Sequence, residues 1–136
     1  MTESGWIFIV GIAVAMISYF AKNFVFQPLL EYKQVAGMIQ NKLKYHSNKI
    51  FNTGFAKEVE KEVSHDLRQL SCDLEEKYYA IALRKRIPTF LGLPSEQVIS
   101  DTASYLIFIS NSIGELDSNT EKHEYYDKIR QNLGII

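Results

Sequence analysis

The sequence contains a single cysteine, Cys72, so no disulfide can form within the chain. A lone thiol suits a reducing compartment. The chain also lacks an excess of charge of either sign, because it has 16 Asp and Glu and 15 Lys and Arg, for a net charge of -1. This balance gives no support to the binding of nucleic acid through overall charge.

Patterns that hold metal ions or phosphate groups are missing as well. No pair of cysteines or of histidines has the spacing of a zinc site, and Gly92 and Gly114 stand alone, outside any glycine-rich loop. Ser64, His65 and Asp66 are the residue types of a catalytic triad, but helix neighbours point about 100° apart and cannot form a relay. We expect a solvated helix face there. We therefore expect no metal, no cofactor and no enzyme.

Charged side chains are absent from residues 4–21, and this gap is the most informative feature of the chain. Gly5–Ala21 gives 17 uncharged positions, and crossing a bilayer takes about 17–25. Lys22 can extend to the headgroups, after which residues 24–26 are apolar again. Trp6 and Tyr19 suit the two interfaces. The sequence therefore predicts a transmembrane helix over residues 5–26.

Two other interpretations of this stretch are less well supported. A cleaved signal sequence needs a basic leader, whereas MTESG carries only Glu3. A soluble core helix has a shorter apolar run. Between residues 22 and 57 there are six lysines and one acidic residue, Glu31, so the positive-inside rule places the N-terminus outside and the remainder in the cytoplasm.

After the span, apolar residues recur at spacings of three and four, which predicts helices over about 29–51 and 56–86. A break over 87–94 contains two prolines, and a helix follows from Ser95 to just before Gly114. Ser118 and Glu121 form a capping-box pattern that opens a last helix ending near residue 133. No strand-like alternation is found. The predicted fold is all-α, with the transmembrane helix followed by a cytoplasmic bundle of about four helices over residues 29–136.

The inward faces of the first two of these helices follow from the same spacing. The helix over 29–51 is expected to bury Tyr32, Val35, Ile39, Leu43, His46 and Ile50. The helix over 56–86 is expected to present a narrow seam of Val59, Val63, Leu67, Leu70, Leu74, Tyr78 and Ile81. Such a seam is typical of helix packing in a bundle or an oligomer.

The helix that begins at Ser95 is apolar nearly all round, so it must be buried on several sides by its own bundle or by a neighbouring subunit. We therefore expect a homo-oligomer, with a tetramer as the expected size. Within the span, small or polar residues recur on one helix face, and Phe8 lies one turn before the first of them. The candidate pore-lining residues are Phe8, Gly11, Ala15, Ser18 and Lys22. This face serves either close helix packing or a narrow pore.

Cationic residues cluster at two places after the span. Arg84, Lys85 and Arg86 form the densest group, at the end of the predicted helix 56–86. They either complement the helix C-terminus or form an anion site shared between subunits. Lys42 and Lys44 are alternative anion-binding candidates, and because they follow the span closely in sequence, contact with anionic lipid is the simpler interpretation.

Two stretches carry a resemblance to a known family: FVFQPLLEYKQVAGMIQNKLKYHSN, residues 24–48, and LGLPSEQVISDTASYLIFISNSI, residues 91–113. They resemble a family of small bacterial proteins with one N-terminal span and a helical cytoplasmic domain, which includes the Hailong-type anti-phage membrane effector. The resemblance implies an oligomeric ion channel of the bacterial inner membrane, held closed by its cytoplasmic helices. It also implies opening by short DNA oligomers that a partner nucleotidyltransferase makes. No binding residue is carried over.

A function of a different class remains open. The span can serve only as an anchor in the lipid bilayer, with the helical bundle recruiting a cytoplasmic partner. An anchor tolerates replacement by an unrelated span, whereas a channel does not, so the two functions are separable by experiment.

Overall fold

The computed structural model describes residues 2–86 and 92–134, and all regular secondary structure in these ranges is helical. The prediction of an all-α fold is confirmed for them. The elements are α1 (Glu3–Ala21), the π-helical turn η1 (Lys22–Phe26), α2 (Gln27–Tyr45), α3 (Ser47–Phe51), α4 (Lys57–Tyr79), α5 (Glu96–Asn111) and α6 (Asn119–Asn132).

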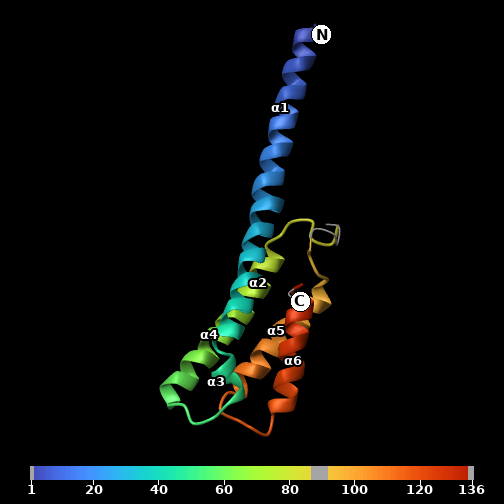
Figure 1. Ribbon diagram of the computed structural model, residues 1–136. Coiled ribbons are helices and arrows are strands. Elements are labelled where there is room, and N and C mark those ends of the chain that lie inside the picture. Colours follow the sequence, from blue (N-terminus) through green and yellow to red (C-terminus); the bar gives the residue numbers. More distant parts are fainter. Residues whose placement is uncertain (1, 87–91, 135–136) are drawn as a thin grey trace.

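The chain has two unlike parts, a projecting helix and a bundle (Figure 1). α1, η1 and α2 form one uninterrupted helix, Glu3–Tyr45, of 43 residues. Its second half packs into the bundle, whereas no residue of α1 is buried. The end of the bundle from which α1 projects is called the α1 end below, and the opposite end, at which α3 lies, is called the α3 end.

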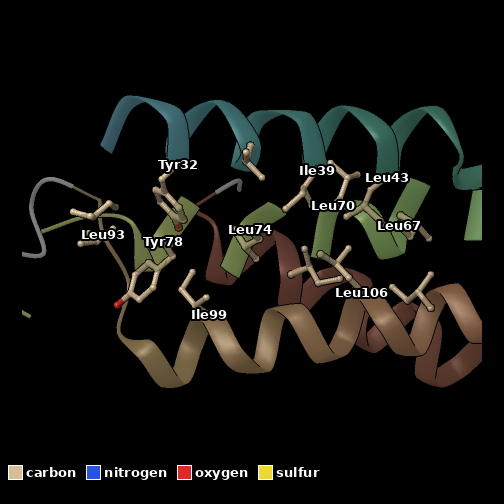
Figure 2. Packing of buried hydrophobic residues seen from close by; sticks show 14 of the residues in the cluster. Tyr32, Ile39, Leu43, Leu67, Leu70, Leu74, Tyr78, Leu93, Ile99 and Leu106 are labelled. Carbon is tan, nitrogen blue, oxygen red and sulfur yellow. The ribbon is translucent and has the colours of Figure 1, made fainter. Parts of the chain in front are cut away.

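Four long helices form the bundle, with α4 at its centre. α4 packs against α2 and α5, and α6 packs against α5 and adds Ile129 to the same core. Figure 2 shows side chains of these helices meeting in a single core. The six predicted inward residues of the helix over 29–51 are all buried, so that prediction is confirmed.

The predicted seam on α4 is also confirmed, since it is buried from Val63 to Ile81 and Val59 is half-buried. Its partners, however, are α2 and α5 of the same chain. The apolar surface of α5 is likewise covered, by α4 on one face and α6 on another. Neither helix therefore leaves an apolar face that requires a second copy, and the oligomer stays a prediction.

Two helix boundaries differ from the prediction. The helix over 29–51 is divided at His46 into α2 and α3. The helix expected to reach residue 86 ends at Tyr79, and residues 80–86 form turns in which Leu83 has a left-handed φ of 59°. Of the predicted break over 87–94, residues 87–91 lie outside the described part of the chain.

The predicted helix caps have different outcomes. Ser95 caps α5, with its Oγ accepting a hydrogen bond from the Val98 N–H at 3.3 Å. Ser118 precedes α6, but its side chain makes no capping hydrogen bond, so the predicted capping box is wrong in its geometry. The first turn of α6 is held instead by the side chain of Lys122, described below.

Candidate functional site

The apolar half of the long helix is the first candidate site. By length and composition α1 and its continuation can cross a bilayer, and none of its most apolar window is buried by the chain. Large apolar side chains cover it, with Phe8 70% exposed and Ile7 73% exposed. Burying such a surface in hydrocarbon instead of water is strongly favourable.

The candidate pore face lies on this exposed helix. Gly11, Ala15, Ser18 and Lys22 follow one another at spacings of four, three and four, and all four are exposed. A side chain added at Gly11 would meet open space. No described part of the chain covers this face, which is therefore free to meet lipid, a neighbouring helix or a pore axis.

The junction between α1 and α2 is built around Pro28. In an α-helix the carbonyl of Phe24 would accept the N–H of residue 28, but proline has no N–H and its ring crowds that carbonyl. The helix responds by widening into the π-helical turn η1, in which the Gln27 N–H donates to the Lys22 carbonyl. The Phe24 carbonyl instead accepts the N–H of Ala82, at 3.1 Å.

This hydrogen bond fixes the position of the basic residues Arg84, Lys85 and Arg86. The turns that carry them follow Ala82 directly, so they lie at the α1 end, beside the base of the projecting helix (Figure 1). α4 ends at Tyr79, and its last turn holds only Lys77 as a cation. The interpretation of these residues as complements of a helix C-terminus is therefore wrong.

Glu96 lies beside two of the three cations and holds Arg84 more closely than Lys85. Its Oε1 atom lies 3.3 Å from Arg84 Nε and 3.8 Å from Lys85 Nζ. The Arg84 guanidinium also stacks over the Tyr79 ring at 4.9 Å. Arg86 is exposed, with its N–H donating to the Leu83 carbonyl at 2.8 Å. The structure thus brings the three together but leaves Lys85 and Arg86 as the cations that face solvent.

Tyr78 lies below this group, where its hydroxyl donates to the Pro94 carbonyl at 2.8 Å. Burial raises the pKa of the Tyr78 phenol, and the Glu96 carboxylate raises it further. A cavity of 430 Å³ lies beside Tyr78, Arg84 and Lys85. Glu96 lines the same cavity, so its carboxylate competes with any anion there.

Lys42 and Lys44 lie at the other end of the bundle. Twenty residues of helix separate Lys42 from Lys22, or about 30 Å at 1.5 Å per residue. Contact with lipid headgroups does not fit this distance if the span ends near Lys22. Lys42 Nζ lies 3.6 Å from Asp66 Oδ2, and Lys44 lines a cavity of 210 Å³ with Tyr126 and Arg130.

A second basic cavity was not found from the sequence. It measures 330 Å³ and lies between the first half of α4 and the end of α5. Lys57, Lys61 and Arg68 line it together with Glu60. Arg68 is held in place by Ser110, whose Oγ accepts from Nε at 3.3 Å. The three cations come from separate turns of α4. The only sequence feature that could have predicted the group is that they share one face of the helix.

Two buried polar groups tie the bundle together. His46 is 2% exposed, and its Nε2 atom lies 3.1 Å from Asp66 Oδ2, so Asp66 joins α4 to α2 and is not part of a solvated face. Lys122 is 1% exposed and its ammonium donates to the Ile50 carbonyl at 3.1 Å, to the Glu115 carbonyl and to Asn119 Oδ1 at 3.2 Å. Burial lowers the pKa of Lys122.

Comparison with known proteins adds no relative: no family model, no curated protein and no solved structure matches this chain. Within the described residues, no three His, Cys, Asp or Glu side chains gather as a metal site. Arguments about function therefore start from the projecting helix, its junction with the bundle and the two groups of cations.

Proposed function

We propose that the chain is an oligomeric ion channel of the bacterial inner membrane, an effector of anti-phage defence that its helical bundle holds closed. Copies of α1 cross the membrane and surround a narrow pore, with the N-terminus outside and the bundle in the cytoplasm. The observation that carries the proposal is the uninterrupted helix Glu3–Tyr45, because any motion of α2 in the bundle must move α1 as well.

The exposed face of this helix supports the arrangement of the copies. Continued through η1, the line of Ser18 and Lys22 reaches Phe26 and Leu30, which are 57% and 56% exposed. Leu30 lies on the side of α2 away from Ile39 and the core, and Phe26 is exposed at the end of η1, one turn before it. Copies that meet through this line would therefore carry their bundles on the outside, where they do not block the axis. A tetramer remains the expected size.

The pore itself would be apolar in its outer half and polar toward the cytoplasm. Phe8 and Gly11 would form a dry constriction that excludes ions until the helices separate or rotate. Ser18 would face the axis below them. Lys22 would add a ring of positive charge at the cytoplasmic mouth, unless the headgroups draw the ammonium outward.

The opening signal we propose is a nucleotide or a short DNA oligomer made by a partner nucleotidyltransferase. Its site in the bundle would be the 330 Å³ cavity that Lys57, Lys61 and Arg68 line. The start of α4 lies at the α3 end, away from α1 (Figure 1), so in the proposed arrangement a soluble ligand could reach this cavity without approaching the membrane. Cations on one helix face match the phosphates of such a ligand.

The anchor function has one observation in its favour. The apolar faces of α4 and α5 are covered within the chain, so the bundle alone does not demand a second copy. An anchored module would use α1 only to stay at the membrane and would recruit a cytoplasmic partner. Its span could then have any apolar sequence.

Replacing the span separates the two functions. The full chain and a variant with an unrelated leucine-rich span in place of residues 5–21 are reconstituted into vesicles that hold a potassium gradient. We expect synthetic short DNA oligomers to release potassium from vesicles with the natural span and not from those with the replacement. No release from either kind of vesicle would favour the anchor. Equal release from both would refute conduction that depends on the natural sequence of this helix.

A further inference from the structure

We propose that the turns after α4 form a docking surface for anionic lipid headgroups. The surface consists of Leu83, Lys85 and Arg86, and it is called the headgroup surface below. The inference rests on one part of the proposed function, that α1 crosses the membrane, and is independent of whether ions pass.

The position of this surface follows from the hydrogen bond between the Ala82 N–H and the Phe24 carbonyl, 3.1 Å long. Phe24 lies near the end of the predicted span over residues 5–26, two residues after Lys22, whose ammonium would extend to the headgroups. The hydrogen bond therefore holds Leu83 close to the expected bilayer surface. Figure 1 shows these turns at the α1 end of the bundle, beside the base of the projecting helix.

The chemistry of the surface suits a membrane and not only water. Leu83 is 55% exposed although it is a large apolar residue, and its φ of 59° is a conformation that L-residues with side chains adopt rarely. Lys85 and Arg86 follow two and three residues later, and the Lys85 side chain is 75% exposed. An apolar side chain flanked by cations matches the boundary between acyl chains and anionic headgroups.

The neighbouring groups direct the cations outward. Glu96 and Tyr79 hold Arg84 against the bundle, with an ion pair of 3.3 Å and a stacked ring, so Arg84 is not available to lipid. Lys85 reaches the same carboxylate only at 3.8 Å, and Arg86 forms no ion pair among the described residues. The two solvent-facing cations are thus the two that a headgroup phosphate can reach.

The test uses the full chain in nanodiscs of phosphatidylcholine with and without phosphatidylglycerol. Hydrogen exchange of the amides of residues 83–86 is measured as the phosphatidylglycerol content rises. We expect the anionic lipid to slow this exchange, and the content needed for half of the effect to rise about fivefold for each cation removed, in Lys85→Gln and in Arg86→Gln. The matched control, Lys44→Gln at the α3 end, should keep the response of the wild type.

A second variant leaves every cation in place. Pro28→Ala supplies an N–H at residue 28 that competes for the Phe24 carbonyl, so the Ala82 N–H should lose its partner. We expect faster exchange at Ala82 and a weaker response of residues 83–86 to anionic lipid. Met38→Ala, at a half-exposed position of α2 without an assigned role, is the control and should change neither.

Two results would overturn the proposal. One is hydrogen exchange at residues 83–86 that is the same in both kinds of nanodisc. The other is slower exchange with short DNA oligomers but not with anionic lipid, which would make these turns a ligand site. Quenching of Trp6, the single tryptophan, by lipids brominated on their acyl chains reports separately whether α1 is in the bilayer. Quenching of Trp6 without a lipid response defeats the headgroup surface alone, whereas no quenching defeats the membrane span.

Discussion

Replacing Lys122 with methionine tests how the short helix α3 is held to the bundle. The substitution keeps the length of the stem and removes the ammonium, which donates to the carbonyls of Ile50 and Glu115 and to the side chain of Asn119. Each carbonyl left without a donor costs about 1–3 kcal/mol. Part of this loss is offset, because an ammonium ion no longer has to be buried.

We expect a net loss of about 2 kcal/mol in the free energy of unfolding at neutral pH. Urea unfolding in mild detergent, followed by far-ultraviolet circular dichroism, measures it. Lys128→Met is the matched control on the same helix, because Lys128 is only half-buried and its ammonium makes surface contacts, with Glu124 four residues away and with the rings of Tyr105 and Tyr125. Removing such surface contacts should cost clearly less than removing the buried ammonium of Lys122.

The pH dependence of Lys122→Met has a defined sign. The pKa of Lys122 is lowered by burial, so above the folded-state pKa the unfolded chain binds more protons than the folded chain. The free energy of unfolding contributed by this residue therefore rises with pH until about 10.5, the pKa of an unperturbed lysine. The difference between wild type and variant should grow over this window and stay constant below it.

Two tyrosines titrate in the same range with the opposite effect. Burial raises the pKa of both Tyr32 and Tyr78, so the folded chain keeps protons that the unfolded chain loses, and stability falls as pH rises above 10. Both chains share this loss, and it cancels in their difference. A Lys122→Met variant as stable as Lys128→Met, or a difference that shrinks toward high pH, would refute the role assigned to the buried ammonium.

The remaining predictions concern the core, the pore and the ligand site. Leu74→Ala, in the fully buried centre of α4, should cost about 3 kcal/mol in urea unfolding, and a loss below about 1 kcal/mol would contradict the packing in Figure 2. In planar bilayers Ser18→Leu should reduce conductance and Gly11→Ser should make the closed state leak by wetting it; currents insensitive to both would refute this pore face. Lys57→Gln combined with Lys61→Gln should weaken binding of DNA oligomers and flatten its salt dependence, and unchanged binding would place the ligand elsewhere.

Periodicity predicted the inward faces of the bundle well, because burial and helical spacing act together. Tyr32, Ile39 and His46 on one helix and Leu67 and Leu74 on the other are buried as expected. The sequence could not say whose surface covers the seam on α4. Helix packing within one chain and between chains requires the same spacing, and only the folded structure shows that α2 and α5 are the partners.

The end of α4 was missed for a reason outside its own residues. Ala80, Ile81 and Ala82 carry no helix-stop signal, and local preference would continue the helix through them. The Ala82 N–H instead satisfies a carbonyl that Pro28 leaves open more than fifty residues earlier, at Phe24. A contact between residues so distant in sequence leaves no local pattern. Because of it, the three basic residues lie at the base of the projecting helix and not at a helix end, where they were predicted.

Lys122 was missed for a related reason. A lysine in the first turns of a polar helix is normally solvated, and its sequence neighbours gave no sign of burial. The ammonium is buried because it meets carbonyls from the end of α3 and from the connection before α6. His46, by contrast, was predicted to face inward from its spacing alone, and only its partner Asp66 had to come from the structure.

The central claim, that α1 conducts ions under control of the bundle, is tested most directly by current recordings from the purified full chain in planar bilayers. We expect no current from the protein alone and discrete, reproducible openings when synthetic short DNA oligomers are added on the side that holds the bundle. A bilayer that contains the inserted protein and stays silent across a range of oligomer lengths and sequences would contradict the channel and leave α1 as an anchor.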